Sequence, residues 1–350
     1  MSNHEKYMNR CLQLAVNGRG YTAPNPMVGS VIVHNDMIIG EGYHQKYGEK
    51  HAEVNAIEAV INKELLYEST LYVNLEPCSH FGKTPPCADF IIKHKIPRVI
   101  IGSIDTFSLV CGNGIQRLKE NGIEVTVGVL EDECRALNKR FFFFHEQKRP
   151  YIILKWAQTL DGYIDIAPEK KQSSKGIWIT NDICRTLVHK WRAEENAIMV
   201  GSTTVITDNP QLNIRYWPGT NPARIVIDKS LRLPPDVFFL DNTQNSIVFN
   251  SKKNETHKNT EYILIQFEED ILPQIFNHLY KRNIQSVIIE GGKILLDTFI
   301  KSGRWDEARI FIGTTSFGSG VKAPEFNYQP LKHEIWDGVN LLIYQNNKVF

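Results

Sequence analysis

The chain has 350 residues, of which 42% are hydrophobic and 23% charged, with 40 basic against 39 acidic side chains. This length favours two domains over a single hydrophobic core, and this composition excludes a disordered chain. The net charge of +1 leaves no basic footprint of a nucleic-acid partner in the total.

Export and membrane signals are not evident in the sequence. Met1–Arg10 is polar and charged, unlike the apolar stretch of a signal peptide. The apolar runs, such as Phe141–Phe144, are far shorter than the ~20 residues of a membrane span. Six cysteines in a chain of this size do not suggest a dense disulfide framework. We therefore expect a cytoplasmic protein without a membrane partner.

The first half alternates helical and strand patterns. Helical spacing of apolar residues predicts helices over 5–16, 53–62, 88–95, 115–121 and 131–144. Short apolar runs predict strands over 28–33, 37–42, 70–75, 98–102 and 123–129. This alternation is typical of a layered α/β domain.

A polar segment before Pro150 marks the predicted domain boundary, which gives domains of 1–146 and 147–350. The second half is again predicted to be α/β. Strands are predicted over 151–156, 197–200, 224–228 and 286–290, and helices over 182–194 and 294–302. The polar stretch 242–261 is predicted to be rich in loops.

Metal-binding residue types in the first half predict a catalytic zinc. His51 and Glu53 lie where a helix begins, whereas Cys78 and Cys87 follow a strand. A catalytic zinc takes three imidazole or thiolate ligands and leaves its fourth position to water, whose pKa it lowers to ~7. A glutamate two residues after a ligand histidine suits proton transfer to a substrate ring. We predict His51, Cys78 and Cys87 as zinc ligands and Glu53 as the catalytic residue.

Other interpretations of these residues stay open at this point. A structural zinc normally has four protein ligands, for which His80 is the candidate. A site without zinc is the further alternative, since His-x-Glu alone is common. Cys111 and Cys134 belong to no motif and are expected to be core thiols.

Eight residues separate Cys78 from Cys87, whereas zinc deaminases usually have two residues between their cysteines. This insertion resembles the deaminase half of the bifunctional riboflavin-biosynthesis deaminase/reductase family. Three further segments share the resemblance: Thr22–Gly29, Gly42–His44 and Leu75–His80. The resemblance implies a cytidine-deaminase-like three-layer domain with one zinc ion. It also implies a diaminopyrimidinone substrate that carries a phosphorylated ribosylamino group. The substrate contacts it implies are Asn25, His44, His80, Lys83 and Asp105.

One segment departs from the family pattern. Where the family has Asp-Pro-Asn-Pro, this chain has Asp105-Thr106-Phe107-Ser108, so a contact from the asparagine is not carried over. A reductase whose zinc-stabilised first domain binds pyrimidine without deaminating it is therefore kept as an alternative.

The second half is less specific when its residues are considered alone. Glu290-Gly291-Gly292 and Gly201–Thr204 each end a predicted strand, and backbone amides at such turns can approach a phosphate. Two ordinary strand-to-helix turns that bind no ligand would have the same sequence pattern. The Gly-x-Gly-x-x-Gly fingerprint of a Rossmann domain is missing from the sequence.

Four segments of the second half are similar to the reductase half of the same family: Lys155–Gly162, Trp178–Thr180, Asp208–Pro210 and Arg224–Asp228. The resemblance implies a dihydrofolate-reductase-like α/β domain that uses NADPH to open a ribosyl group to a ribityl chain. The NADPH contacts it implies are Ala157, Trp178, Thr204, Asp208, Gly292, Lys293, Ile294, Leu295, Leu296, Asp297 and Thr298. The substrate contacts it implies are Arg192, Leu212, Arg215 and Glu290. Gly176 stands where the family often has serine.

The sequence therefore predicts a bifunctional enzyme that performs two consecutive reactions on one pyrimidine ribosyl phosphate, as a homodimer or homotetramer. A deaminase of free nucleotides or of tRNA adenosine is the rival enzyme. The balanced charge and the long cysteine spacing argue against the tRNA version. The non-enzymatic alternative is a zinc-stabilised binding module. Such a module would not need a proton carrier, so the presence of Glu53 argues against it.

Overall fold

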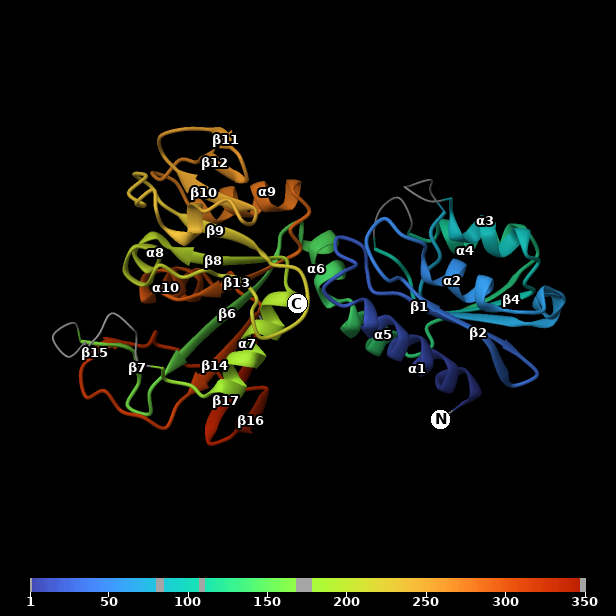
Figure 1. Ribbon diagram of the computed structural model, residues 1–350. Coiled ribbons are helices and arrows are strands. Elements are labelled where there is room, and N and C mark those ends of the chain that lie inside the picture. Colours follow the sequence, from blue (N-terminus) through green and yellow to red (C-terminus); the bar gives the residue numbers. More distant parts are fainter. Residues whose placement is uncertain (1, 80–84, 107–110, 168–177, 347–350) are drawn as a thin grey trace. The chain divides into compact units, whose positions relative to one another are not determined.

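The computed structural model describes residues 2–79, 85–106, 111–167 and 178–346. The chain folds as two compact units, Met1–Lys148 and Arg149–Phe350 (Figure 1). The sequence places the boundary close by, after residue 146. No helix in the described part of the chain is long and apolar enough to cross a membrane.

The first unit contains a five-stranded sheet in the order β2-β1-β3-β4-β5. β1 pairs antiparallel with β2 and β3, whereas β3, β4 and β5 run parallel. The strands are β1 (Gly29–His34), β2 (Met37–Tyr43), β3 (Thr70–Leu75), β4 (Arg98–Ser103) and β5 (Glu124–Val127). Because β3 and β4 are parallel neighbours, the residues that follow them lie at the same edge of the sheet.

Helices cover both faces of this sheet (Figure 1). On one face, Met8 of α1 packs with Val31 of β1 and Cys134 of α5. On the other face, Ile57 of α2 packs with Ile32, the next residue of β1. Successive strand residues point to opposite faces, so the first unit has the predicted three-layer α/β architecture. Its helices are α1 (Asn3–Ala15), α2 (Ala52–Ala59), α3 (Cys87–Lys93), α4 (Asn113–Glu120), α5 (Glu131–Leu137) and α6 (Lys139–Gln147), with 3-10 turns η1 (Val16–Gly18) and η2 (Lys63–Glu68).

The single helix predicted over 131–144 is wrong, because α5 and α6 are separate helices. Asn138 lies between them with φ −102° and ψ 25°. Its buried side chain accepts a hydrogen bond from the Met27 N–H at 2.8 Å and donates one to the Met27 carbonyl at 2.9 Å. These bonds to a distant loop hold Asn138 outside helical geometry, and apolar periodicity does not reveal them.

The second unit contains a ten-stranded mixed sheet in the order β11-β12-β10-β9-β8-β13-β6-β14-β17-β16. Its strands are β6 (Tyr151–Gln158), β8 (Ala197–Gly201), β9 (Ala223–Ile227), β10 (Ser246–Asn250), β11 (Glu255–His257), β12 (Thr260–Leu264), β13 (Ser286–Glu290), β14 (Glu307–Ile312), β16 (Lys332–Trp336) and β17 (Val339–Gln345). A separate two-stranded sheet pairs β7 (Tyr163–Ile166) with β15 (Gly320–Lys322). In the large sheet β8, β13 and β6 are parallel neighbours, so their carboxyl ends meet at one edge.

Two pairs of helices cover this sheet. Leu272 of α9 (Ile271–Lys281) and Phe299 of α10 (Lys293–Ser302) belong to the core on one face. On the other face, Val205 of α8 (Ser202–Asp208) packs with Val200 of β8. Trp191 of α7 (Asp182–Glu194) stacks on a β14 phenylalanine.

The prediction that 242–261 is rich in loops is correct for only half of the segment, because the other half forms β10, β11 and the start of β12. β10 is an inner strand whose polar ends are buried and hydrogen-bonded. Ser246 donates to the Phe239 carbonyl at 3.1 Å, and Asn250 donates to the Ile263 carbonyl at 3.2 Å. Since the sheet satisfies these polar groups, the polar composition is misleading here.

Candidate active sites

Three ligand side chains meet in the first unit. His51 precedes α2, Cys78 follows β3 and Cys87 opens α3. The His51 Nδ1 atom lies 3.6 Å from Cys78 Sγ and 3.3 Å from Cys87 Sγ, and all three ligand atoms lie within 4.8 Å of one another. Around a tetrahedral zinc, bonds of ~2.3 Å to sulfur and ~2.05 Å to nitrogen place such ligand atoms about 3.6 Å apart. The three side chains therefore fit one zinc ion.

The surroundings of Cys78 favour its thiolate, which is the form that binds metals. Hydrogen bonds from the thiol of Cys87 and from His51 lower the pKa of Cys78. The backbone N–H of Cys87 also donates to the Cys78 sulfur at 3.3 Å. The first residue of α3 therefore stabilises the negatively charged thiolate of Cys78.

Glu53 lies in the first turn of α2 and its side chain is buried. Burial raises the pKa of Glu53 from its ordinary value of 4.5 to about 7. The three-residue ligand group does not include it. A carboxylate with a pKa near neutrality can both accept a proton and return it, as deamination requires.

Two predicted substrate residues, Asn25 and His44, lie beside the metal ligands. The rings of His44 and His51 meet edge to face, with centroids 5.1 Å apart. His44 Nδ1 lies 3.1 Å from the Lys50 carbonyl oxygen, and Nε2 lies 3.1 Å from Asn25 Nδ2. Because a carbonyl only accepts, Nδ1 carries the proton and Nε2 accepts from the Asn25 amide. Burial lowers the pKa of His44, which is consistent with this neutral ring.

Asp105 follows β4 and is tied to a buried carboxylate at the end of the neighbouring strand. Its backbone N–H donates to Glu76 at 3.3 Å. Glu76, which directly follows β3, also accepts three amides where α4 begins: Gly112 at 3.0 Å, Gly114 at 3.0 Å and Ile115 at 3.2 Å. One side chain thus joins the Asp105 segment and the first turn of α4 to the strand that leads to Cys78.

Glu76→Gln is expected to lower the free energy of unfolding of the first unit by about 3 kcal/mol, because the amide NH₂ faces backbone donors in place of an acceptor. Urea unfolding monitored by deaminase activity would measure the loss. Glu120→Gln is the matched control, since Glu120 accepts from exposed Gln116 on α4 and the change is expected to cost under about 0.5 kcal/mol. Equal urea midpoints for the two variants would contradict the anchoring role of Glu76.

Three residues singled out in the sequence lie outside the described residues of this unit. They are His80 and Lys83, which are predicted to contact the substrate, and Phe107, which departs from the family pattern.

In the second unit, buried charges gather where β6, β13 and α7 meet. Glu290 ends β13 and accepts from Arg192 Nε at 3.0 Å and Nη2 at 2.7 Å. Lys155 pairs in register with Glu290, and its Nζ lies 3.9 Å from the carboxylate. Burial alone would raise the pKa of Glu290, but Arg192 and Lys155 outweigh it and lower the value to about 2. Burial lowers the pKa of Lys155.

The other two predicted substrate residues of this unit lie in the segment after α8. Leu212 is buried with a positive φ of 51°. Arg215 is exposed, and its Nη1 donates to Gln211 Oε1 at 2.9 Å. The same segment contacts the charge cluster, because Arg192 Nη1 donates to the Asn213 carbonyl at 3.2 Å. The structure therefore brings Arg192 and Glu290 together and connects them to the Leu212–Arg215 segment.

Predicted NADPH residues from two neighbouring strand ends also meet. Gly291 and Gly292 have φ of 83° and 57°, and a Cβ added to Gly292 would lie 3.1 Å from Thr204 Oγ1. Gly292 precedes α10, whose N-terminus no described side chain caps. The first amides of α10 and the Thr204 hydroxyl can thus face a phosphate, which fits the predicted cofactor.

Within α10 the predicted cofactor residues differ in what they can offer. Leu295 and Leu296 have buried side chains in the core, so only their backbone can serve a ligand. Lys293 and Asp297 form an ion pair of 3.0 Å. Thr298 donates to the carbonyl of Ile294 at 2.8 Å, whereas the Ile294 side chain itself is exposed.

The remaining predicted cofactor residues are Ala157 near the end of β6, Asp208 at the end of α8 and Trp178 before α7. Trp178 is exposed, and the guanidinium of Arg185 lies over its ring, 4.9 Å from the centroid. Gly176 lies outside the described residues.

Comparison with known proteins supports both halves. A family model described as the cytidine and deoxycytidylate deaminase zinc-binding region matches residues 1–103, and the RibD C-terminal domain model matches residues 150–334. The riboflavin biosynthesis protein RibD of Aquifex aeolicus is 40% identical over 339 residues, covering 95% of this chain and 92% of its own. The Escherichia coli protein of that name is 34% identical over 359 residues, covering 94% and 96%. The chain belongs to the RibD family.

Solved structures agree with this family. A Thermotoga maritima diaminohydroxyphosphoribosylaminopyrimidine deaminase/5-amino-6-(5-phosphoribosylamino)uracil reductase superposes with a TM-score of 0.86 at 36% identity, covering 98% of both chains. Acinetobacter baumannii RibD superposes with a TM-score of 0.87 at 33% identity, covering 97% of this chain and 98% of that one. As a RibD-family protein, the chain is a bifunctional deaminase and reductase of riboflavin biosynthesis, with a zinc-binding deaminase domain and an NADPH-dependent reductase domain. The sequence prediction of this activity is confirmed.

Two residues to which the sequence assigns no role contact predicted site residues: Lys155 lies beside Glu290, and Glu76 accepts from Asp105. A lysine inside the apolar run 151–156 is unusual and is the signal in the sequence that could identify Lys155. Glu76 lies two residues before Cys78. Its four backbone partners come from residues 105–115, and no local pattern indicates them.

Proposed function

We propose that residues 1–146 deaminate a diaminopyrimidinone carrying a phosphorylated ribosylamino group, and that residues 147–350 then reduce its ribosyl group to ribityl. The name of the Thermotoga maritima relative contains both activities on such a pyrimidine. The observation that carries the proposal is the placement of Glu53 beside a three-ligand group whose spacing fits a tetrahedral metal.

In the deaminase, water replaces the amine at ring position 2, which leaves as ammonia. When bound, zinc supplies Lewis acidity that makes hydroxide available at neutral pH. Glu53 takes one proton of the water and delivers it to the ring nitrogen, and then takes the second proton from the new hydroxyl group and delivers it to the leaving amine. Its burial excludes bulk water from these transfers. Since the amide nitrogen of Asn25 donates to His44, its carbonyl oxygen can accept from an N–H of the substrate.

In the reductase, the side chains bind the substrate and supply a proton. When bound, NADPH supplies the hydride for the ribosyl carbon that carries the amine. The ring opening also requires one proton, for which we propose the Lys155 ammonium, since burial makes it more acidic. Glu290 holds Lys155 and Arg192 in place. The exposed guanidinium of Arg215 suits a phosphate, because its planar fork can bind two oxygens.

The decisive experiment is mass spectrometry of the products that purified enzyme makes from the diaminopyrimidinone ribosylamino phosphate. Without NADPH, we expect replacement of one amine by oxygen; with NADPH, we expect two added hydrogens as well. Removing zinc with a chelator should stop the first step and spare the reduction of pre-deaminated substrate. Reduction without any deamination by the zinc-loaded enzyme would contradict the proposed first activity. Failure of both reactions would contradict the proposed substrate.

We further propose that the enzyme is a cytoplasmic homo-oligomer, a dimer or a tetramer. A reducing compartment keeps the thiols of Cys78 and Cys87 available for zinc. β16 is an edge strand of the large sheet and exposes Ile335, which supports pairing with a second copy. Light scattering of the eluting protein would measure the mass of the assembly.

A further inference from the structure

The segment Gln211–Arg215, named here the arginine loop, holds an exposed guanidinium in a defined place. Arg215 Nη1 donates to Gln211 Oε1 at 2.9 Å and to Asn213 Oδ1. The backbone of the loop also receives Arg192, which donates to the Asn213 carbonyl at 3.2 Å. Both arginines proposed to serve the substrate thus depend on the conformation of this loop.

The arginine loop does not keep this conformation by local preference. Leu212, in its middle, has a positive φ of 51°, which a branched side chain rarely adopts. Contacts from elsewhere must hold such a residue. Two of them reach the far end of the loop: the Arg215 N–H donates to His189 Nδ1 at 3.1 Å, and the Ile214 N–H donates to Asn221 Oδ1 at 2.9 Å.

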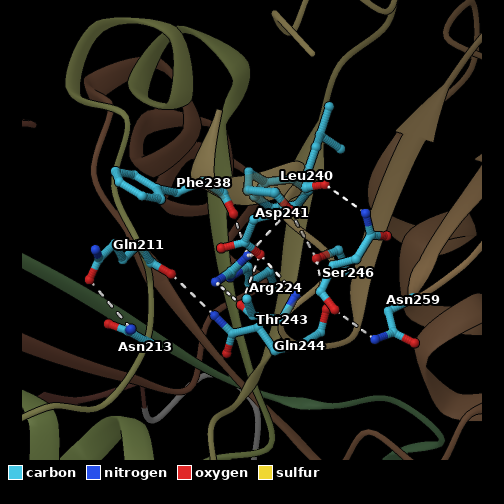
Figure 2. Close-up of polar contacts among 12 residues, drawn as sticks. Gln211, Asn213, Arg224, Phe238, Leu240, Asp241, Thr243, Gln244, Ser246 and Asn259 are labelled. Carbon is cyan, nitrogen blue, oxygen red and sulfur yellow. Dashed lines mark hydrogen bonds and ion pairs between the residues drawn. The ribbon is translucent and has the colours of Figure 1, made fainter. Parts of the chain in front are cut away.

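The near end of the loop is held by Gln244, as Figure 2 shows. Gln244 Nε2 donates to the Gln211 carbonyl at 3.1 Å, and the side chain is 8% exposed. A carbonyl only accepts, so the nitrogen of this amide must face the loop. The contact fixes the backbone of the residue whose own side chain binds Arg215.

Gln244 is itself anchored by a buried charge. Arg224, at 1% exposure, donates to Asp241 Oδ1 at 2.8 Å and to Thr243 Oγ1 at 3.2 Å (Figure 2). A third bond reaches the Phe238 carbonyl. These contacts hold the segment just before Gln244 against β9. Hydrogen bonds that are joined through the chain at Thr243–Gln244 and at Gln211 therefore connect the sheet to the guanidinium of Arg215.

We propose that Gln244 is a positioning residue for reductase substrate binding, which acts through Gln211 to place Arg215 for an anionic group of the substrate. This inference rests on the proposed role of Arg215 in binding the substrate phosphate. The side chain of Gln244 contacts the backbone of the arginine loop and is not proposed to contact the substrate.

Gln244→Glu and Gln244→Met test the proposal. The first places an acceptor against the Gln211 carbonyl, and the second removes the donor while nearly keeping the volume. Each is expected to raise the reductase KM for the pre-deaminated substrate about fivefold, the effect of losing one neutral hydrogen bond. The reductase kcat should stay within about twofold, because the groups around the transferred hydride are unchanged. Deaminase activity of the same chain should not change.

Gln274→Met is the matched control. Gln274 Nε2 donates to the Gln266 carbonyl at 2.9 Å and to the Asp270 carbonyl at 3.2 Å, and its Oε1 accepts from the Gln266 N–H at 2.9 Å. The variant therefore loses at least as many side-chain bonds as Gln244→Met, and the reductase KM should stay at the wild-type value. Circular dichroism identifies variants that do not fold, and if the carboxylate variant is among them, the methionine variant carries the test.

A double-mutant cycle with Arg215→Ala separates the proposed role of Arg215 in substrate binding from the proposed positioning role of Gln244. Arg215→Ala alone should raise the KM about 30-fold, as expected for a lost bond to a charged group, and adding Gln244→Met should raise it no further. An unchanged KM in Arg215→Ala would overturn the proposed role of Arg215. A raised KM in Arg215→Ala with wild-type values in both Gln244 variants would overturn the positioning role alone. Multiplied effects in the double variant, or a loss confined to kcat, would overturn it too.

Discussion

Glu53→Gln is expected to reduce deamination by about 10³-fold or more, because general acid–base catalysis contributes up to ~10⁴-fold to such reactions. The amide has the size of the carboxylate but can neither take the proton of water nor deliver it to the ring. The proposed zinc ligands are His51, Cys78 and Cys87, so the variant should bind the metal in a 1:1 ratio. Reduction of pre-deaminated substrate should be unaffected, since that site lies in the other unit.

Ammonia release, zinc content by elemental analysis and the reductase rate, measured on one preparation, check this result. Glu58→Gln is the matched control on α2. Glu58 forms an exposed ion pair with Lys50 at 2.7 Å, and its loss should change deamination less than about twofold. Retained turnover in Glu53→Gln would remove Glu53 from its role. Loss of zinc together with turnover would show that Glu53 supports the metal instead.

Glu290→Gln is expected to abolish reduction and to lower the free energy of unfolding of the second unit by about 3 kcal/mol or more. The substitution leaves Arg192 and Lys155 as two buried cations that lack their shared carboxylate partner. Both side chains would also lose the geometry in which they face the substrate. Deamination should continue at the wild-type rate.

The stability difference should depend on pH in a defined direction. The pKa of Glu290 is lowered from its ordinary 4.5 to about 2 in the folded protein. Its ionised form therefore stabilises the fold fully above about pH 5, and this contribution is lost as the pH falls through about 2. The difference in the free energy of unfolding between wild type and Glu290→Gln should become smaller as the pH falls over this range.

A reductase assay at pH 7 measures the loss of activity, and urea unfolding monitored by tryptophan fluorescence, repeated from pH 7 to pH 3, measures the difference in stability. Glu255→Gln is a suitable control, since Glu255 pairs with Lys253 in an exposed ion pair whose loss costs at most about 1 kcal/mol. If Glu290→Gln lowers the free energy of unfolding as little as the control does, the stability of the second unit does not depend on the ion pairs of Glu290 with Arg192 and Lys155. A difference independent of pH would contradict the ionised state of this carboxylate.

The sequence by itself determined the family and the two α/β halves, and it indicated the three candidate zinc ligands that the structure brings together. His51 and Glu53 are two residues apart at the start of a helix, so local geometry alone places both in one turn. Short apolar runs located β3 and β13 with the bounds that the structure has. These features depend on neighbours along the chain, which periodicity and spacing describe.

Only the tertiary structure decided the features that depend on distant partners. Asn138 interrupts a helical pattern because it binds Met27, and the polar residues of β10 are buried because the sheet satisfies them. Lys155 meets Glu290 because β6 and β13 are adjacent in the sheet, and Gln244 meets Gln211 across two separate loops. Strand order and loop packing are set by the burial of the whole domain, so no local window of the sequence contains them.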